Sequence, residues 1–262
     1  MISVKNLRFA YQDMDVLNGI SFEVSAGEMA AIMGPNSSGK STLLHIICGM
    51  FRPRTGEVLI NSKPLQALSR KEIAKSVALV PQIQPAGLPF TVAQTVLMGR
   101  NPHRSALSFD NENDVKVVTN ALIMTDTYHL RDRYLDELSG GERQRVMIAK
   151  ALAQETFCLL MDEPTAFLDV KHQISVMETL RKLNRERGAT VLLVSHDINL
   201  AAVFCPRVIL IRDGIIIADG APEKVISEEN LFAAYGVEMT VLSAGEGVKA
   251  VAPQVRKILS GD

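Results

Sequence analysis

A glycine-rich stretch near the N-terminal end of the sequence has the residue types that bind phosphate. Residues 34–42, Gly-Pro-Asn-Ser-Ser-Gly-Lys-Ser-Thr, match the pattern G-x-x-x-x-G-K-[ST]. Glycines let backbone amides approach a phosphate closely, and the start of the following helix attracts its negative charge. Lys40 adds a positive charge, and Ser41 offers a hydroxyl to Mg²⁺. A turn that merely caps a helix would not require this lysine, so we predict a nucleoside triphosphate site formed by Gly34, Pro35, Asn36, Ser37, Ser38, Gly39, Lys40, Ser41 and Thr42.

Two carboxylates follow an apolar segment later in the chain. Residues 158–161 are apolar and precede Asp162 and Glu163. At the carboxyl end of a parallel strand, these side chains would lie beside the phosphate loop. Asp162 could then orient the ligands of Mg²⁺, and Glu163 could polarise a water for attack on the γ phosphate. Alone, the pair would fit a solvated acidic turn better, but together with the phosphate loop it predicts hydrolysis.

A second candidate for phosphate binding begins at Leu138. Residues 138–145 are Leu-Ser-Gly-Gly-Glu-Arg-Gln-Arg and open a predicted helix. Small residues there leave the amides of the helix free to bind an anion, although Ser139 could also serve only as the N-cap. One nucleotide site does not need two such helix ends. We therefore interpret the second one as serving a nucleotide bound to another molecule.

This last stretch is where the sequence resembles the ATP-binding-cassette (ABC) family, whose signature motif is L-S-G-G. The resemblance covers about residues 1–235, with all motifs in family order. It implies that Tyr11 stacks on adenine, and that Gln82 reaches Mg²⁺ and a membrane partner. It also implies that Lys40, Glu163 and His196 take part in catalysis, and that Ser41, Gln82 and Asp162 hold Mg²⁺. The nucleotide of the opposite chain would contact Ser139, Gly140, Gly141, Glu142 and Asp169.

The sequence departs from the family pattern at two places. Many members have a glycine at the position of Ser37, and serine tolerates a positive φ less well. We expect ATP binding to survive, with an altered affinity. Residues 165–169, Thr-Ala-Phe-Leu-Asp, differ from the more common Ser-Ala-Leu-Asp ending. Because the spacing is kept, we expect Asp169 to keep its role.

A finer resemblance concerns residues 99–103, Gly-Arg-Asn-Pro-His, which follow Leu-Pro-Phe-Thr-Val at 88–92. This string is similar to the ATPases of iron-siderophore, haem and cobalamin importers, whose architecture molybdate importers can share. Locally, it predicts a helix that ends at Gly99 and a turn at Asn101-Pro102. The resemblance implies a homodimer on two permease subunits, fed by a substrate-binding protein. The chain would lie peripherally on the cytoplasmic face of the inner membrane, and no residue in it would identify the cargo.

Composition limits the alternatives. The 262 residues include 28 basic and 29 acidic ones, so the basic excess typical of nucleic-acid binding is missing. This balance and the single motif set disfavour a non-transport ABC ATPase acting on nucleic acid or ribosomes. A simple P-loop kinase would not explain residues 138–142. The three cysteines are odd in number and widely spaced, which indicates buried thiols. We expect no signal peptide and no membrane-spanning helix, because no apolar run approaches about 20 residues.

Alternating apolar segments and helical patterns must position these motifs. We expect strands over 2–9, 20–24, 29–33, 57–60, 77–80, 157–161 and 191–194, and a hairpin of 208–211 with 215–218. Helices are predicted over 40–50, 92–98, 112–124, 141–153, 171–187 and 198–204. The pattern predicts an α/β fold of the P-loop type, with a mainly parallel sheet, an antiparallel β part and an inserted helical subdomain. Residues 1–88 and 156–235 would form the core, 89–155 the helical subdomain, and 236–262 a short C-terminal extension.

Overall fold

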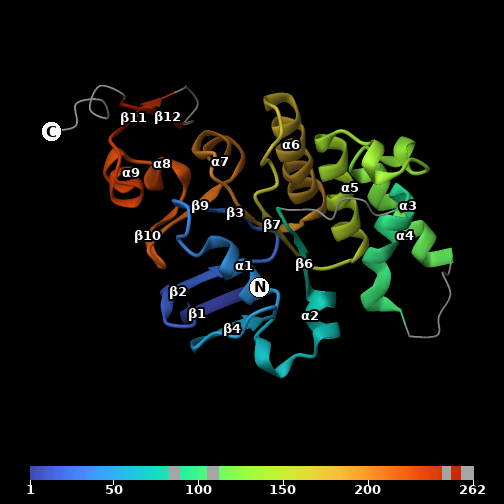
Figure 1. Ribbon diagram of the computed structural model, residues 1–262, viewed down its shortest axis with the longest axis horizontal. Helices are drawn as coiled ribbons and strands as arrows, with labels where there is room; N and C mark the ends of the chain where they lie inside the picture. Colours follow the sequence, from blue (N-terminus) through green and yellow to red (C-terminus); the bar gives the residue numbers. More distant parts are fainter. Residues whose placement is uncertain (83–88, 105–111, 244–248, 255–262) are drawn as a thin grey trace. The chain divides into compact units, whose positions relative to one another are not determined.

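A computed structural model of the chain describes residues 1–82, 89–104, 112–243 and 249–254 (Figure 1). The chain divides into two compact units. The first comprises residues 1–25, 29–65 and 192–262, and the second comprises residues 26–28 and 66–191. The described residues between 89 and 155 form helices and turns, with one isolated β-bridge between Thr91 and Tyr134. The division into a core and a helical subdomain at 89–155 stays a prediction.

An antiparallel sheet of the first unit is built near the N-terminus, with strand order β2-β1-β4-β5. These strands are β1 (Ile2–Tyr11), β2 (Met14–Val24), β4 (Thr55–Ile60) and β5 (Lys63–Pro64). Side chains of β2 alternate between buried and exposed only from Ile20 onward, and this half is the strand that the sequence predicts. The prediction misses residues 14–19 because they are mostly polar or half-exposed. Pairing of Tyr11 with Met14 makes the two strands one hairpin.

A larger sheet contains the strands that precede the site motifs, in the order β10-β9-β3-β8-β7-β6. Of these, β3 (Met29–Met33), β7 (Cys158–Asp162) and β8 (Thr190–Val194) are buried along their whole length, as continuous apolar runs indicate. The pairs β3 with β9 (Arg207–Arg212) and β6 (Val77–Val80) with β7 are parallel. Strand β10 (Ile215–Gly220) pairs antiparallel with β9, as the Asp213-Gly214 turn predicts. The predicted α/β class with a mainly parallel sheet is therefore confirmed.

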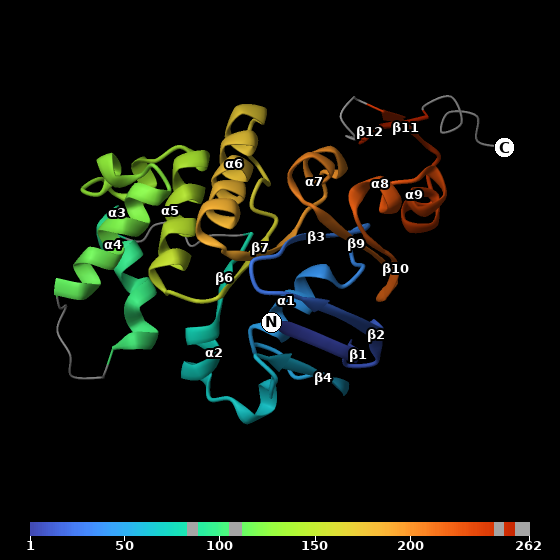
Figure 2. The ribbon, with the colours of Figure 1, turned by 180° about the vertical axis from the view of Figure 1, so that it is seen from behind.

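Helices of the second unit include a group formed by α3 (Val92–Leu97), α4 (Glu112–Met124) and α5 (Gly140–Ala153), seen together in Figure 2. They share one apolar core whose central members, Val96, Val146 and Ala149, are fully buried. The unit also contains α2 (Arg70–Ser76), α6 (Val170–Arg187) and short 3₁₀ turns at 65–67, 128–130 and 135–137. Sequence reasoning misses α2, although Ser69 and Glu72 form a capping box at its start.

One local prediction is wrong: the helix does not end at Gly99. Helix α3 continues directly into a 3₁₀ helix over Met98–His103, and Pro102 lies inside it. Gly99 and Arg100 of this 3₁₀ helix are buried, and the backbone at Gly99 approaches the carbonyl oxygen of Lys150 closely.

The C-terminal part of the first unit is more regular than the sequence suggests. It contains α7 (Ile198–Phe204), α8 (Pro222–Val225), α9 (Glu228–Tyr235) and a hairpin of β11 (Met239–Ser243) with β12 (Lys249–Pro253). The hairpin has a continuous antiparallel register from Met239–Pro253 to Ser243–Lys249. The unit is completed by α1 (Lys40–Ile47), which follows β3.

Candidate nucleotide-binding site

The phosphate loop connects β3 to α1, and two of its positions require glycine. Gly34 has φ 150°, and a Cβ there would lie 1.9 Å from the carbonyl oxygen of Ile211. Gly39 has φ 96° and precedes α1 as its N-cap; a Cβ there would lie 2.5 Å from Leu17 Cδ2. Any side chain at either position would displace the loop, so the pattern of glycines is dictated by close approach and by backbone conformation.

Lys40 is held over this loop, although it is the first residue of α1. Its Nζ donates hydrogen bonds to the carbonyl oxygens of Gly34 (3.0 Å) and Pro35 (2.6 Å) and to Ser38 Oγ (3.3 Å). The side chain is buried. The ammonium group is thereby placed at the concave side of the loop, where it can bind phosphate oxygens. Ser37 has φ 63° in the same loop, so the position does require the conformation that glycine adopts more easily.

An aromatic group covers one side of α1. The hydroxyl of Tyr11, at the end of β1, forms a hydrogen bond of 3.3 Å with Thr42 Oγ1, in which either oxygen can be the donor. Its ring meets those of Phe9 and Phe51 edge-on, with centroid distances of 4.9 and 5.7 Å. The Tyr11 ring remains partly exposed. An adenine could therefore stack on it, and this role stays a prediction.

His196 lies at the end of β8 within the same unit as the phosphate loop. The amide of Ser195 donates to the carbonyl of Ile32 at 3.1 Å, which joins the end of β8 to the end of β3 just before the loop. Asp197 caps α7 through Leu200 N at 2.8 Å, so His196 occupies the turn between strand and helix. The imidazole is exposed, and its predicted contact with the γ phosphate stays a prediction.

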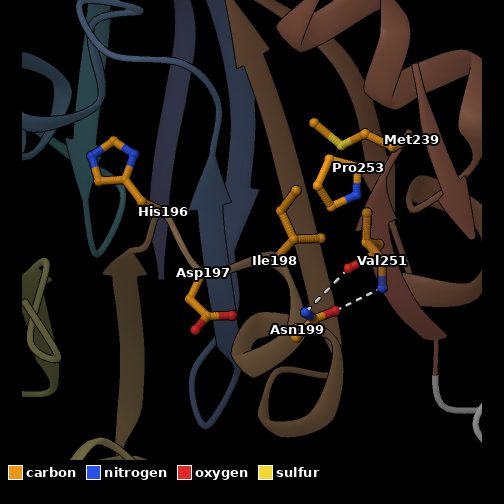
Figure 3. Close-up of a pocket in the computed structure, with 7 residues that line it drawn as sticks. All are labelled: His196, Asp197, Ile198, Asn199, Met239, Val251 and Pro253. Atoms are coloured by element: carbon orange, nitrogen blue, oxygen red, sulfur yellow. Dashed lines mark hydrogen bonds between the residues drawn. The ribbon is translucent and has the colours of Figure 1, made fainter. Parts of the chain in front are cut away.

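The C-terminal hairpin is attached just beyond this turn. Asn199 and Val251 exchange two hydrogen bonds, of 2.8 and 3.4 Å, which tie β12 to α7 (Figure 3). The hairpin, the turn and the start of α7 line a shallow pocket formed by His196, Asp197, Ile198, Asn199, Met239, Val251 and Pro253. Sequence reasoning misses Asn199, because nothing in its local pattern indicates a partner 52 residues away.

Gln82 and Glu163 meet in the second unit because of strand register. Strands β6 and β7 are parallel, with Val80 opposite Met161, so residues two positions further along each strand emerge side by side. Gln82 Nε2 donates a hydrogen bond to Glu163 Oε2 at 2.5 Å. Glu163 has φ 50°, a strained conformation for a non-glycine residue of the kind found at functional sites. Asp162, the last residue of β7, is buried.

The start of α5 is a complete capping box. Ser139 Oγ accepts from the Glu142 amide at 3.4 Å, while the Ser139 amide donates to Glu142 Oε2 at 2.9 Å. Hydrogen bonds from Ser139 hold the pKa of Glu142 below its ordinary value. Ser139 and Gly140 are exposed, and their predicted contact with the nucleotide of another copy stays a prediction. Glu142 is occupied as a capping residue, and its predicted contact with nucleotide stays untested.

Asp169 caps α6 and binds a histidine that the sequence analysis does not single out. Its Oδ1 accepts from the amide of His172 at 2.9 Å and from His172 Nδ1 at 2.8 Å. The His172 ring lies against Gly141: a Cβ on that glycine would come within 2.3 Å of His172 Cδ2. His172 therefore joins the start of α5 to the start of α6. The spacing Asp-x-x-His at a predicted helix start is a signal that could have found it. Nearby, Phe167 is 91% exposed with φ 61°.

Each unit thus assembles part of the predicted site. The first holds Tyr11, residues 34–42 and His196, and the second holds Gln82, Asp162, Glu163, residues 139–142 and Asp169. No group of three or more His, Cys, Asp and Glu side chains suited to a metal occurs in the described part of the chain. Over the same residues, none of the helices has the length and apolarity needed to cross a membrane.

Comparisons with known proteins show the family to which the chain belongs. A family model described as ABC transporter matches residues 17–166. The petrobactin import ATP-binding protein FpuC of Bacillus anthracis is 37% identical over 246 residues, covering 94% of this chain and 90% of that protein. A metal-chelate type ABC transporter solved in an inward-facing conformation matches with a TM-score of 0.86 and 29% identity, over 98% of this chain and 99% of that one. The dimeric structure of a bacterial ABC transporter cassette matches with a TM-score of 0.72 and 32% identity, over 85% of this chain and 99% of that one. The chain therefore belongs to the ABC transporter family, as one of its ATP-binding and ATP-hydrolysing subunits.

Proposed function

We propose that this chain is the ATPase subunit of an importer for metal chelates, with iron-siderophore complexes as the favoured cargo class. The observation that carries the proposal is the likeness to the petrobactin import protein over nearly the full length of both chains. The neighbouring metal-chelate type transporter points to the same class. Haem, cobalamin and molybdate complexes are the remaining candidates. The competing function, a non-transport ATPase acting on nucleic acid or ribosomes, has no such support.

In the proposed site, residues 34–42 bind the phosphates of ATP and Tyr11 stacks on adenine. Lys40 exchanges its bonds to the loop carbonyls for bonds to phosphate oxygens. Mg²⁺ fits the donors Ser41, Gln82 and Asp162, which are all oxygen ligands of the kind that this ion prefers. When bound, the ion neutralises charge on the β and γ phosphates.

Glu163 is the proposed general base. It accepts a proton from a water whose oxygen attacks the γ phosphorus, and the bond between that phosphorus and the β–γ bridging oxygen breaks to give ADP and phosphate. Gln82 holds one carboxylate oxygen of Glu163 at 2.5 Å, which fixes the direction of the other. His196 contacts the γ phosphate and stabilises its negative charge in the transition state.

The site is completed by a second copy of the chain. One protomer would supply the phosphate loop, Gln82, Asp162, Glu163 and His196. The partner's Ser139, Gly140, Gly141, Glu142 and Asp169 would reach the same nucleotide. The exposure of Ser139 and Gly140 at the start of α5 supports this, and so does the dimeric form of the similar bacterial cassette. Hydrolysis removes the γ phosphate that joins the two copies, and they separate.

Two permease subunits would receive this motion through the surface near Gln82 and the helices around α3 and α4. The chain would then lie on the cytoplasmic face of the membrane, peripherally, and a separate binding protein would deliver the cargo. None of the cargo's atoms would touch this chain.

The variant Glu163→Gln tests the catalytic assignment. It should bind ATP with near wild-type affinity, hydrolyse it at least about 100-fold more slowly, and form a dimer that persists in size-exclusion chromatography with ATP. Near wild-type turnover would show that Glu163 is not the base. Affinity purification of the tagged chain from its membrane fraction tests the physiological class: co-purification of an integral membrane protein supports transport, and co-purification of ribosomal RNA supports the alternative.

A further inference from the structure

The Gly-Arg-Asn-Pro-His segment at 99–103 is packed against the C-terminal end of α5. A Cβ on Gly99 would lie 2.3 Å from the carbonyl oxygen of Lys150 and 3.3 Å from the Cβ of Ala153. Gly99 has no positive φ, so its backbone does not require glycine. The close approach of the 3₁₀ helix to α5 does. The first residue of this motif therefore serves to bring the second one, Arg100, into contact with the helix end.

Arg100 ties the end of α5 to the start of α4. Its Nη1 donates to the carbonyl oxygen of Ala153 at 2.7 Å and to Glu155 Oε2 at 2.5 Å, and its Nε donates to Asp114 Oδ1 at 2.8 Å. Arg100 and Asp114 are each only 3% exposed. A guanidinium can satisfy three partners at once because its donors lie in one rigid plane. Its charge also complements the negative end of the α5 dipole.

The last residue of the motif binds the same helix end. The Nε2 atom of His103 lies 2.8 Å from the carbonyl oxygen of Gln154, one residue beyond α5. The Gln154 side chain in turn donates to the carbonyl oxygens of Ala74 (2.5 Å) and Val77 (3.1 Å). The C-terminal end of α5 is thus fixed on one side by Arg100 and His103, and on the other by the start of β6.

Nothing in the proposed hydrolysis step uses these contacts, yet they hold the helix whose opposite end carries Ser139. We infer that Arg100 is a positioning residue for the nucleotide contact made by residues 139–142, and this inference rests on the proposed dimeric site. Helix α5 has 14 residues and is therefore about 21 Å long, so a tilt of about 5° at the Arg100 end displaces the Ser139 end by about 2 Å. A displacement of about 1 Å can reduce turnover by about 100-fold when a group contacts reacting phosphates.

The inference predicts that Arg100 acts on the nucleotide bound by the partner and not on the nucleotide bound by its own chain. A mixed dimer separates these two effects. One subunit has Lys40→Ala, and the other has Ser139→Arg. Only one site is then intact: it combines the phosphate loop of the Ser139→Arg subunit with the Ser139 end of the Lys40→Ala subunit. Purification through two different affinity tags isolates this dimer.

Arg100→Lys is then placed in one subunit or the other. Lysine keeps the charge beside Asp114 but lacks the fork that reaches Ala153 and Glu155 together. In the Lys40→Ala subunit, it should lower kcat at least about 10-fold. In the Ser139→Arg subunit, it should change kcat less than about twofold, because the Ser139 end of that subunit is already blocked. The matched control is Arg104→Lys, whose side chain contacts the same Asp114 at 3.3 Å.

Equal losses in both arrangements would overturn the inference, because they would show an effect through overall stability. A larger loss with Arg100→Lys in the Ser139→Arg subunit would overturn it too, because it would show an effect through Gln82 of the same chain. No loss in either arrangement would overturn it as well. If Arg100→Lys does not fold, His103→Ala, which removes a separate contact with the same helix end, should show the same asymmetry with a smaller loss. The mixed dimer without any change at Arg100 must itself hydrolyse ATP. Inactivity there would refute the shared site on which the inference rests, whereas an active mixed dimer without the asymmetry would refute the role of Arg100 alone.

Discussion

The contact between Gly141 and His172 predicts a specific steric coupling between the starts of α5 and α6. A Cβ at position 141 would lie 2.3, 2.7 and 2.9 Å from Cδ2, Cγ and Cβ of His172. Because the last two atoms form the base of the side chain, the ring alone cannot swing away. The rotamer must change to relieve the contacts with Cγ and Cδ2, and the backbone must shift slightly to relieve the contact with Cβ. That change would break the 2.8 Å contact between His172 Nδ1 and Asp169 Oδ1.

The expected magnitude for Gly141→Ala follows from two opposing terms. Overpacking a well-packed contact costs about 1–3 kcal/mol, whereas replacing a helical glycine by alanine contributes about 0.5–1 kcal/mol. The variant should therefore lower the free energy of unfolding by about 1–2 kcal/mol. In a His172→Ala background the contacts with Cγ and Cδ2 are gone but the contact with Cβ at 2.9 Å remains, so the same substitution should lower the free energy of unfolding by less than about 1 kcal/mol. The coupling energy of the pair is then about 1 kcal/mol, within the range of residues in contact.

Urea unfolding of wild type, both single variants and the double variant measures this coupling. Gly140→Ala is the control, because its Cβ would meet only the flexible end of Leu168 at 3.1 Å. It should change the unfolding free energy by less than about 1 kcal/mol. The reasoning is refuted if Gly141→Ala destabilises the protein equally with and without the His172 ring. ATP turnover of Gly141→Ala should fall, and His172→Ala should not restore it fully, because Asp169 then lacks its imidazole partner.

Three further predictions concern groups whose environment is unusual. The hydrogen bond from Arg100 holds the pKa of Asp114 below its ordinary value, so this carboxylate stabilises the fold above the unfolded-state pKa of about 4 and loses that contribution as the pH falls. Wild type and Asp114→Asn should therefore differ less in unfolding free energy as the pH is lowered below about 4, as measured by urea titrations at successive pH values. A difference that stays constant over these pH values would contradict the assignment. Burial raises the pKa of the thiols of Cys158 and Cys205 to about 12. When native protein is treated with iodoacetamide near neutral pH, mass spectrometry should therefore detect no label on these two cysteines. Any label should be found on the partly exposed Cys48. Ser37→Gly relieves about 1 kcal/mol of strain at φ 63° but frees the unfolded chain by about as much. Its unfolding free energy should thus change by less than about 1 kcal/mol, and both proteins should bind ATP in equilibrium titrations; identical affinities would show that the serine has no influence on binding.

The local pattern of apolar residues predicts those elements whose buried positions are continuous or periodic along the sequence. Strand β6 and helices α4 and α7 have the predicted bounds, Val77–Val80, Glu112–Met124 and Ile198–Phe204. Each of them contrasts clearly with its flanking residues. The β9–β10 hairpin was equally predictable, because Asp213 and Gly214 both adopt the positive φ that their types favour.

Elements stabilised by distant partners could not be predicted in this way. The strands β11 and β12 are only half-buried, and their alternation is correspondingly weak. They depend on pairing with each other and on Asn199, which no local pattern reveals. The predicted end at Gly99 fails for a related reason. Glycine usually marks a helix end, but here the carbonyl of Lys150 occupies the space that a side chain would need.

The same distinction separates what was predictable about the site. Phosphate binding constrains residue types directly, because glycines, a lysine and a hydroxyl must follow one another in a loop. Such a motif can be recognised in the sequence because its residues are consecutive. The meeting of Gln82 with Glu163 depends instead on the register of β6 and β7, which are distant in sequence. Two strands slipped by one residue would present the neighbouring side chains to opposite faces. The register of β6 and β7, with Val80 opposite Met161, therefore determines whether the proposed base has its amide partner.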